Sequence, residues 1–414
     1  MSAPSPAGPL RVPDPEPFLG IEAQEAERIA AAVARLLPSS LVPFFGARFT
    51  RSDLLFDEYV YRLAVQVFAD ARLGAAVGEW GTAADVVARG GLDPRCSVVP
   101  VDWLLRHLAA RGALARQDGA AGPRFRAERV VPAFDPASVL AAQRRHDPSC
   151  LPSYVLAETA ARDYPEFLRG KRSGEEILLT PTRLSLWMSY FSNDNALYAV
   201  NNSVGAAALE AWMPPRAGAI LELGGGLASG AIAVLERLAA AGRLGEVRAY
   251  RFTELVPAFI RRAPRLLEAF AGAPFLTFAP LDMNLSFVEQ GVASESVSIV
   301  YAVNTLHVAH DLAFTLGEIR RVLTPGGQLI VSECVRPSLG QTLYPEFVFN
   351  LLETFRTPRL HPGYRPNGGF LTPEQWTEAL EAAGFLDVRV FPDIARIRDV
   401  VPVFSVAAIG ATRP

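Results

Sequence analysis

The stretch Ala217-Gly-Ala-Ile-Leu-Glu-Leu-Gly-Gly-Gly-Leu-Ala-Ser-Gly230 decides the fold, because a short apolar run leads directly into a glycine-rich turn. Residues 217–223 have the length and composition of a buried strand, and residues 231–240 those of a helix. Gly224 and Gly226 remove side chains where the backbone must bend and approach a ligand, and Gly230 lets the helix pack closely on the strand. We therefore expect a strand, a tight turn and a helix that together bind a nucleotide-like cofactor.

The turn alone does not identify the cofactor. Its spacing, G-x-G-x-x-x-G over residues 224–230, differs by one residue from the G-x-G-x-x-G pattern of enzymes that bind nicotinamide dinucleotides. The residues that follow the later strands must therefore distinguish a nicotinamide dinucleotide from another nucleotide-like cofactor.

Strands alternate with helices from residue 217 onward, which predicts a parallel sheet with helices on both faces. Glu254 follows the second predicted strand, and its carboxylate can accept hydrogen bonds from both hydroxyls of a ribose. Asp282 and Met283 follow the third strand, where a carboxylate and an apolar side chain can frame an adenine. Asn304 and His307 follow the fourth strand, and Glu333 ends the fifth.

Taken in order, the segments ELGGGLASG, FTEL, PLDMN, NTLH and TPGGQLIVSE resemble class I S-adenosylmethionine-dependent methyltransferases, over roughly 200 residues. The resemblance implies an α/β fold in residues 214–414, a Rossmann-like doubly wound sheet of seven strands, with S-adenosyl-L-methionine as the cofactor. The cofactor site that we expect consists of Glu222, Gly224, Gly225, Gly226, Glu254, Leu255, Asp282, Met283 and Asn304.

The resemblance also implies that the fourth and fifth strands are neighbours, which brings His307 and Glu333 together at the ligand-binding edge. An imidazole suits the removal of a proton from a methyl acceptor, and a carboxylate on its other nitrogen fixes the tautomer and stabilises the imidazolium. We expect His307 and Glu333 to form a catalytic dyad with His307 as general base. The alternative is that His307 caps its loop and Glu333 is a solvated strand end.

The N-terminal third is expected to be mainly helical. Six prolines in residues 1–18 predict an extended tail. Residues 19–150 form the next unit, and between Thr82 and Val131 the order helix, turn, helix and hairpin indicates a winged helix. This unit is similar to the N-terminal domain of small-molecule O-methyltransferases, which commonly dimerise through it, so we expect a homodimer.

Residues 151–213 are expected to form a helical connector that lines the substrate pocket, because aromatic side chains surround a polar run there. The substrate-binding residues that we expect are Trp187, Tyr190, Phe191, Asn195 and Tyr198, together with His361 from the later loop over residues 359–367. Some pyruvate C-methyltransferases of similar build hold iron with two histidines, but His307 and His361 have no identifiable carboxylate ligand beside them to complete a metal-binding triad. We therefore predict no metal.

The acceptor atom is left open by the resemblance. The stretches YRFTELVPAF and NTLHVAHDLAFTLGEIRRVLTPGG look like the C-methyltransferase domains of polyketide synthases. The O-methyltransferase motif HDW places an aspartate directly after the catalytic histidine, whereas here Val308 follows His307. The substrate is expected to be a small molecule, either free or tethered to a carrier protein.

Composition limits the other classes of function. The chain has 414 residues, half of them apolar, and a formal net charge of -3, which gives no electrostatic footprint for a nucleic acid or an anionic membrane. Three scattered cysteines and the lack of a long apolar run predict a cytoplasmic protein.

The function that we expect is methylation of a hydroxyl or an acidic carbon on a small aromatic or polyketide-like molecule of secondary metabolism. A second hypothesis is an enzyme that binds S-adenosylmethionine but catalyses a cyclisation or rearrangement without methyl transfer. A third is a winged-helix regulator that senses a small molecule, although Arg106, His107 and Arg111 offer a poor surface for DNA phosphates.

Overall fold

The computed structural model describes residues 15–119, 122–214, 218–270, 275–402 and 404–414. Most of the predicted tail, residues 1–14, lies outside the described residues. Residues 15–18 do not belong to a tail, because helix α1 (Pro15–Ala34) begins with them. Pro15 and Pro17 fall in its first turn, where the missing N–H of proline costs no hydrogen bond.

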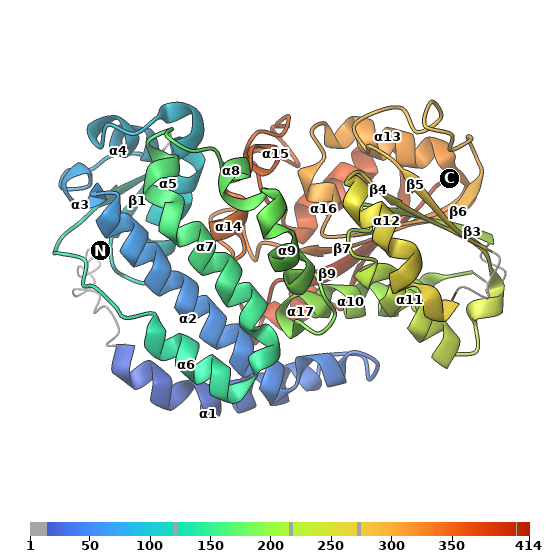
Figure 1. The fold of residues 1–414 in the computed structure, drawn as a ribbon, viewed down its shortest axis with the longest axis horizontal. Helices are drawn as coiled ribbons and strands as arrows, with labels where there is room; N and C mark the ends of the chain where they lie inside the picture. The colour runs from blue at the N-terminus through green and yellow to red at the C-terminus, as the bar shows by residue number, and fades with distance from the viewer. Residues whose placement is uncertain (1–14, 120–121, 215–217, 271–274, 403) are drawn as a thin grey trace, which may run out of the picture.

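The N-terminal half is built from helices and one two-stranded hairpin (Figure 1). After α1 come α2 (Ala47–Asp70), α3 (Leu73–Ala76), α4 (Ala83–Arg89), α5 (Pro94–Ala110), β1 (Ala115–Gly119), β2 (Gly122–Arg126), α6 (Ala137–His146) and α7 (Leu151–Leu168). The connector continues with α8 (Gly174–Leu178), α9 (Leu184–Tyr190) and α10 (Ala196–Trp212). Thr82 caps α4 with a capping box to Asp85, and α4, α5 and the hairpin follow one another in the predicted order.

The C-terminal half contains a seven-stranded sheet in the order β5-β4-β3-β6-β7-β9-β8. Its strands are β3 (Gly218–Leu223), β4 (Val247–Glu254), β5 (Leu276–Pro280), β6 (Val297–Val303), β7 (Leu323–Cys334), β8 (Leu386–Phe391) and β9 (Val406–Thr412). Its helices are α11 (Ser229–Ala240), α12 (Pro257–Leu266), α13 (Leu312–Val322), α14 (Glu346–Phe349), α15 (Glu353–Arg356), α16 (Pro373–Ala382) and α17 (Ile394–Arg398).

Six of these strands run in the same direction, and β9 runs antiparallel to both of its neighbours. Helices cover both faces, with α10 and α11 below the sheet and α13 and α16 above it in Figure 1. This is the predicted doubly wound arrangement, and it places the carboxyl ends of β3, β4, β6 and β7 at one edge.

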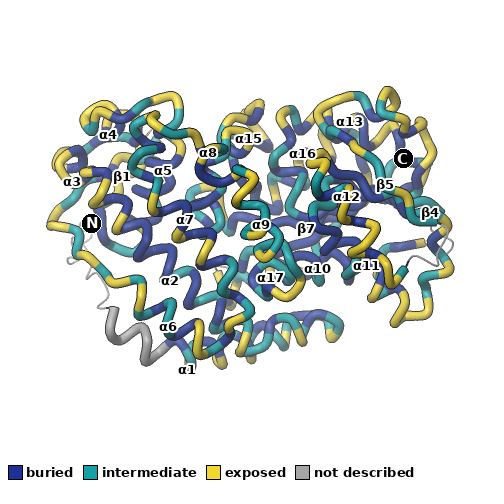
Figure 2. The backbone as a smooth tube through the Cα atoms, viewed as in Figure 1, coloured by how far each residue is buried: buried dark blue, intermediate teal, exposed yellow. Residues whose placement is uncertain are grey.

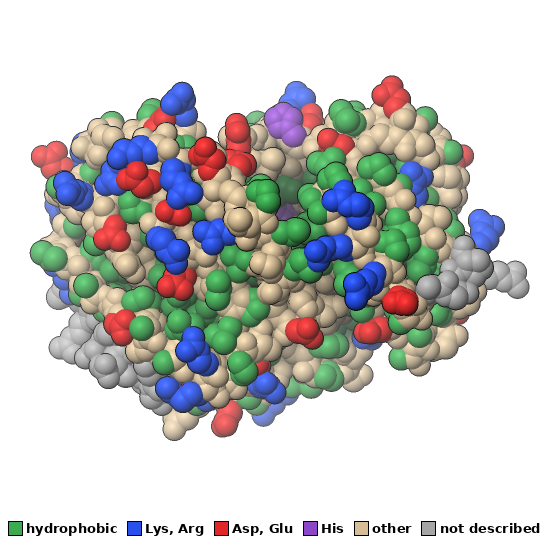
Figure 3. Space-filling view, in the orientation of Figure 1, with side chains coloured by type: hydrophobic (Ala, Val, Ile, Leu, Met, Phe, Trp, Pro, Cys, Tyr) green, Lys and Arg blue, Asp and Glu red, His purple; other side chains and the backbone are tan. Residues whose placement is uncertain are grey.

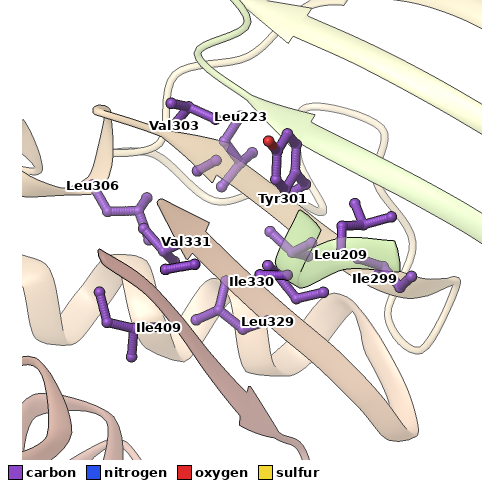
Figure 4. Close-up of a cluster of buried hydrophobic side chains, with 14 of the residues drawn as sticks. Leu209, Leu223, Ile299, Tyr301, Val303, Leu306, Leu329, Ile330, Val331 and Ile409 are labelled. Atoms are coloured by element: carbon purple, nitrogen blue, oxygen red, sulfur yellow. The ribbon is translucent and has the colours of Figure 1, made fainter. Parts of the chain in front are cut away.

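The centre of the sheet is closely packed with branched aliphatic side chains. Figure 4 shows Ile299 of β6 and Ile330 of β7 on the face of the sheet that Leu209 of α10 covers, whereas Leu223 of β3 and Ile409 of β9 lie on the opposite face. All five are nearly inaccessible to solvent. Burying a side chain of this kind contributes about 1.5–3 kcal/mol, so this cluster holds the strand ends at fixed positions.

The two halves exchange segments, which the boundaries predicted at residues 150 and 213 do not capture. Val33 of α1 and Phe45 pack into the core of the sheet half, whereas Phe347 and Leu351, which follow β7, pack into the core of the helical half. The Trp103 indole of α5 donates to the backbone oxygen of Leu343 across this junction. Figure 2 shows continuous burial through the middle of the molecule, so the halves share one extensive interface.

None of the helices in the described part of the chain is long and apolar enough to cross a membrane.

Candidate active site

The glycine-rich turn lies between β3 and α11, and its glycines have different tasks. Gly224 and Gly226 adopt positive φ values of 62° and 54°. A Cβ atom on Gly225 would lie 2.1 Å from the Phe252 ring, whereas a Cβ on Gly226 would meet nothing within 4 Å. Gly230 packs against Glu222 and Val303, as the close approach of helix and strand requires. Gly226 is therefore the glycine with open space in front of it.

Glu254 ends β4 and is held by three backbone donors. Its Oε2 atom accepts from the Gly226 N–H at 2.9 Å, and its Oε1 atom accepts from the N–H groups of Leu255 and Val256 at 2.8 and 2.9 Å. Oε1 already accepts two hydrogen bonds and Oε2 accepts one, so the remaining lone pair of Oε2 can still accept a hydrogen bond from a ribose. The carboxylate is thus fixed in place beside the turn.

A cavity of about 350 Å³ opens between the turn and the ends of β4, β5 and β6. Seven of the predicted cofactor residues line it: Gly224, Gly226, Glu254, Leu255, Asp282, Met283 and Asn304. Glycine backbone, two carboxylates and the Met283 thioether are the groups that fit a nucleoside with a short polar tail. The cofactor-binding role of each residue stays a prediction.

Two predicted cofactor residues do not line this cavity. Gly225 is turned toward β4, where its N–H donates to the Thr253 carbonyl and its Cα faces the Phe252 ring. Glu222 is buried beneath the first turn of α11, and burial raises its pKa to about 8. Alternate residues of a strand point to opposite faces, and Glu222 points inward, so both residues support the turn from behind.

His307 and Glu333 meet at the ends of β6 and β7, which are neighbours as expected. His307 lies in the short 3-10 helix η6 (Leu306–Val308), and its Nδ1 atom lies 2.6 Å from Glu333 Oε2. The other oxygen, Oε1, accepts from the backbone N–H groups of Thr305, Leu306 and His307. Glu333 is completely buried, so it is not a solvated strand end.

The backbone of His307 is held from the opposite side by Arg365. This buried guanidinium donates to the carbonyl oxygens of His307 at 2.5 Å and Ala309 at 2.7 Å. Burial lowers the pKa of Arg365 to about 10. The loop over residues 359–367 therefore supports the catalytic segment.

A second cavity, of about 400 Å³, lies between the two halves and contains His307 in its wall. Tyr190, Phe191 and Tyr198, which we expected to bind substrate, line it, and Phe191, Tyr198, Val256 and Asn304 also line the cavity beside the glycine turn. The two cavities are therefore adjacent. We refer to the two as the substrate cavity and the cofactor cavity; their binding roles stay predictions. Figure 3 shows a hollow flanked by hydrophobic side chains beside α12.

Three residues predicted to bind substrate lie outside the lining of this cavity. The Trp187 ring stacks behind Phe191, and its indole N–H donates to the Leu178 carbonyl. Asn195 is fully buried and donates to Ser153 and to the Tyr190 carbonyl. His361 is exposed and stacks on Tyr364. Trp187 and Asn195 shape the wall from behind, and His361 does not approach His307 as a metal partner would.

Among the described residues, no group of three or more histidine, cysteine, aspartate or glutamate side chains could hold a metal ion.

The structure adds polar residues that the sequence reasoning missed. Asn201 of α10 donates to Asn304 Oδ1 at 3.0 Å, and the same oxygen accepts from the Cys334 N–H at 2.9 Å. Asn304 has a φ of 47°, so these bonds hold it in an unusual conformation at the junction of the two cavities. An asparagine pair inside the mainly apolar helix α10 is a signal in the sequence for Asn201. Asp53 and Tyr344 also line the substrate cavity.

Comparisons with known proteins agree with this arrangement. Residues 227–331 match the family described as a methyltransferase domain. The chain is similar to the polyketide synthase PksM of Bacillus subtilis, with 27% identity over 242 residues, which are 56% of this chain and 5% of PksM. It thus spans a small part of that relative's length.

Solved structures are similar over most of the chain. The CurJ carbon methyltransferase superposes with a TM-score of 0.71 at 22% identity, covering 95% of this chain and 98% of that one. The trans-methyltransferase CalH, in complex with SAH, superposes with a TM-score of 0.59 at 20% identity, covering 87% of this chain and 90% of that one. The predicted methyltransferase fold is confirmed, and with the family match it implies S-adenosylmethionine as cofactor.

Proposed function

We propose that this chain, whose C-terminal half is a methyltransferase domain that uses S-adenosylmethionine, methylates an acidic carbon of a polyketide-like acyl substrate. The observation that carries the proposal is the buried pair of His307 and Glu333, in a cavity adjacent to the one lined by the glycine turn. A carbon between two carbonyl groups must lose a proton before it can accept a methyl group. His307 would remove that proton.

The cofactor would be held by backbone and carboxylate groups at the sheet edge. Gly226 leaves room for its close approach, Glu254 accepts from the ribose, and Asp282 with Met283 frames the adenine. S-adenosylmethionine supplies an electrophilic methyl group on a positively charged sulfur. Residues that line both cavities, Asn304 among them, separate the two bound molecules.

His307 works through the partner on its inner nitrogen. With Nδ1–H donated to Glu333, the lone pair of Nε2 is free to take the proton from the substrate carbon. The imidazolium that results is stabilised by the Glu333 carboxylate. Because that carboxylate also binds three backbone N–H groups, the imidazole and its loop are held in one orientation.

Carbon is preferred over oxygen as the acceptor for two reasons. The residue after His307 is Val308, so the aspartate of the O-methyltransferase motif is missing at that position. The relatives support the same choice, because the sequence match is to a polyketide synthase and a similar structure is a carbon methyltransferase. A carrier-tethered acyl thioester is the substrate form that agrees with relatives of this type.

The test is methylation of a 3-oxooctanoyl thioester of N-acetylcysteamine with S-adenosylmethionine labelled with carbon-13 in its methyl group. We expect S-adenosylhomocysteine to form and the label to reside on the carbon between the two carbonyls. A label on oxygen would refute carbon methylation. Conversion of the substrate without S-adenosylhomocysteine would instead favour the cyclisation or rearrangement hypothesis.

Proton exchange tests the role of His307 independently of methyl transfer. In deuterated buffer without the cofactor, the protein should accelerate exchange of the same carbon-bound proton, and His307→Ala should remove that acceleration. Exchange catalysed equally by both proteins would exclude His307 as the base.

A further inference from the structure

The substrate cavity contains a carboxyl group that no cation accompanies. Asp53 of α2 lines the cavity together with His307, and its Oδ1 atom accepts from the Tyr344 hydroxyl at 2.8 Å. Its Oδ2 atom has no hydrogen-bond partner among the residues that the structure describes. No lysine or arginine belongs to the lining of this cavity. Asp53 is therefore an acceptor that faces the space a substrate would fill.

Several other carboxylates in and beside the helical half are paired with arginine, and Glu333 is paired with His307. Glu58, which also lies on α2, binds Arg62 and Arg111, and Glu346 binds Arg336. Arg51 lies two residues before Asp53 in the sequence but pairs with Glu22. A charge removed from water is unfavourable unless it is paired, so a solitary carboxyl in a mainly apolar cavity indicates that its partner comes with the ligand.

The electrostatics of the cavity agree with an unpaired acid. Burial raises the pKa of Asp53 to about 6, the Tyr344 hydrogen bond opposes that rise, and Asp57 adds to it. Burial, with smaller contributions from Glu333 and Asp53 among the neighbours, also raises the pKa of the Cys334 thiol to about 12. Asp53 and Cys334 therefore line the same cavity. A positive charge in that cavity would be stabilised by the Asp53 carboxylate.

Several aromatic side chains line the same cavity as this carboxyl. The Phe56 ring, one turn further along α2, contacts the Tyr344 ring edge to face at a centroid distance of 5.1 Å. Phe49, Tyr190 and Phe349 line the same cavity. A carboxylate combined with aromatic faces is the chemistry that recognises a protonated amine, because the rings attract the cation and the carboxylate neutralises it.

We propose that Asp53, together with Tyr344, binds a protonated amine on the acyl chain of the substrate while His307 acts on the carbon between the carbonyls. This inference rests on the proposed function, since it assumes an acyl substrate in the same cavity. It narrows the substrate class to acyl chains that carry a basic nitrogen.

The experiment compares thioesters that differ only at the end of the chain. N-acetylcysteamine thioesters of 3-oxo acids with six, eight and ten carbons are prepared with a terminal methyl, hydroxyl or ammonium group. For at least one length we expect kcat/KM to be about tenfold or more higher for the ammonium form than for the other two, as a charge-assisted hydrogen bond predicts. Equal values, or a preference for hydroxyl at every length, would overturn the proposal.

Variants then assign the effect to one side chain. Asp53→Asn keeps the shape of the side chain and should remove the preference for ammonium, so that kcat/KM becomes similar for the three forms of the substrate. Asp57→Asn is the matched control, because Asp57 lies one turn further along α2, pairs with Arg111 and does not line the cavity. A preference that survives Asp53→Asn would also overturn the proposal.

Binding of octylammonium, measured by calorimetry, tests the amine site without requiring methyl transfer. If the wild-type protein methylates none of the thioesters in the comparison above, the proposed carbon methylation of acyl thioesters is wrong, but the amine site can still be tested by binding. Octylammonium should still bind to wild type and to Asp57→Asn and bind about tenfold or more weakly to Asp53→Asn. Equal affinities for wild type and Asp53→Asn would refute the amine site by itself. The melting temperature of each variant shows whether it is folded.

Discussion

Glu333 and His307 are joined twice, once through the imidazole and once through the backbone. Glu333 Oε2 lies 2.6 Å from His307 Nδ1, while Oε1 accepts from the His307 N–H and from the two N–H groups before it. One carboxylate at the end of β7 thereby fixes both the orientation of the base and the path of its loop. This arrangement explains why a completely buried acid is retained at the edge of the sheet.

Glu333→Gln should slow methyl transfer strongly. The amide cannot neutralise an imidazolium, so we expect kcat to fall by about 100-fold or more, within the range typical of general base catalysis. The affinity for S-adenosylmethionine, measured by calorimetry, should change little. In the double variant with His307→Ala, kcat should equal that of His307→Ala alone, because the two groups act as a unit. Additive losses would show that Glu333 acts independently.

Two glycine substitutions should separate packing from ligand approach. A methyl group on Gly225 would collide with the Phe252 ring, so Gly225→Ala should lower the free energy of unfolding by about 1–3 kcal/mol. The methyl group of Gly226→Ala would meet no atom within 4 Å, so this variant should lose only the cost of a positive φ, about 1 kcal/mol of the free energy of unfolding. The methyl group would, however, enter the cofactor cavity.

Chemical denaturation and cofactor titration measure both effects. We expect the larger loss of stability in Gly225→Ala and the larger loss of cofactor affinity in Gly226→Ala. The reverse order would contradict the assignment of Gly226 to the ligand side of the turn.

The sheet and the contact between His307 and Glu333 could be predicted because they depend on local patterns, on one topological rule and on the family resemblance. Apolar runs indicated the strands, the rule that parallel strands end at one edge placed His307, Glu333 and Glu254 at that edge, and the resemblance implied that the strands of His307 and Glu333 are neighbours. Which residues of the turn face the cofactor cavity and which face the protein interior was not predictable. Gly225 and Glu222 belong to the same motif as Gly226, but which of them faces the ligand depends on the Phe252 ring and on the strand's pleat.

Contacts between distant segments were beyond the reach of sequence patterns. Asp53 and Tyr344 are separated by 291 positions, and their hydrogen bond exists because the segment after β7 crosses into the helical half. The same crossing brings residues 343–351 into the core of the helical half, a contact that a division of the chain into consecutive segments does not describe. Trp187 and Asn195 have the composition of a pocket wall, but their polar atoms bind neighbouring backbone and side-chain groups instead of facing the cavity.

Glu222 should make stability depend on pH. Burial raises its pKa to about 8, whereas in the unfolded chain it has the ordinary value near 4.5. Between these values the folded state binds a proton that the unfolded state releases, so the stabilising protonated form is lost as the pH rises. The slope contributed by this group is at most about 1.4 kcal/mol per pH unit.

Glu222→Gln removes that titration. The free energy of unfolding of this variant, relative to wild type, should therefore increase from pH 5 to pH 8, as measured by urea denaturation at several pH values. Glu236→Gln, an exposed carboxyl on α11, serves as the control and should give a constant difference. A constant difference for Glu222→Gln as well would mean that its carboxyl is not protonated in the folded protein.

Arginines on α12 should assist a substrate that arrives on an acidic carrier protein. Arg261, Arg262 and Arg265 are exposed, and no described acidic side chain pairs with them. The helix follows Val256, which is half-exposed and lines both cavities, and Figure 3 shows Lys and Arg side chains gathered over α12 beside the hollow. A positive patch beside the entrance would attract an acidic partner and orient it.

Charge reversal tests this expectation and, with it, the tethered form of the substrate. Arg261→Glu combined with Arg265→Glu should lower kcat/KM about tenfold for a 3-oxooctanoyl group on an acyl carrier protein, with a smaller effect at high salt. The same change should leave kcat/KM for the N-acetylcysteamine thioester within about twofold, because a free thioester makes no use of the patch. Arg144→Glu combined with Arg145→Glu, on the exposed side of α6, introduces the same charge change away from the cavity and should affect neither substrate. An equal loss of kcat/KM for both substrates would indicate damage to the active site. An unchanged kcat/KM for the carrier-bound substrate would show that α12 does not recognise the carrier protein.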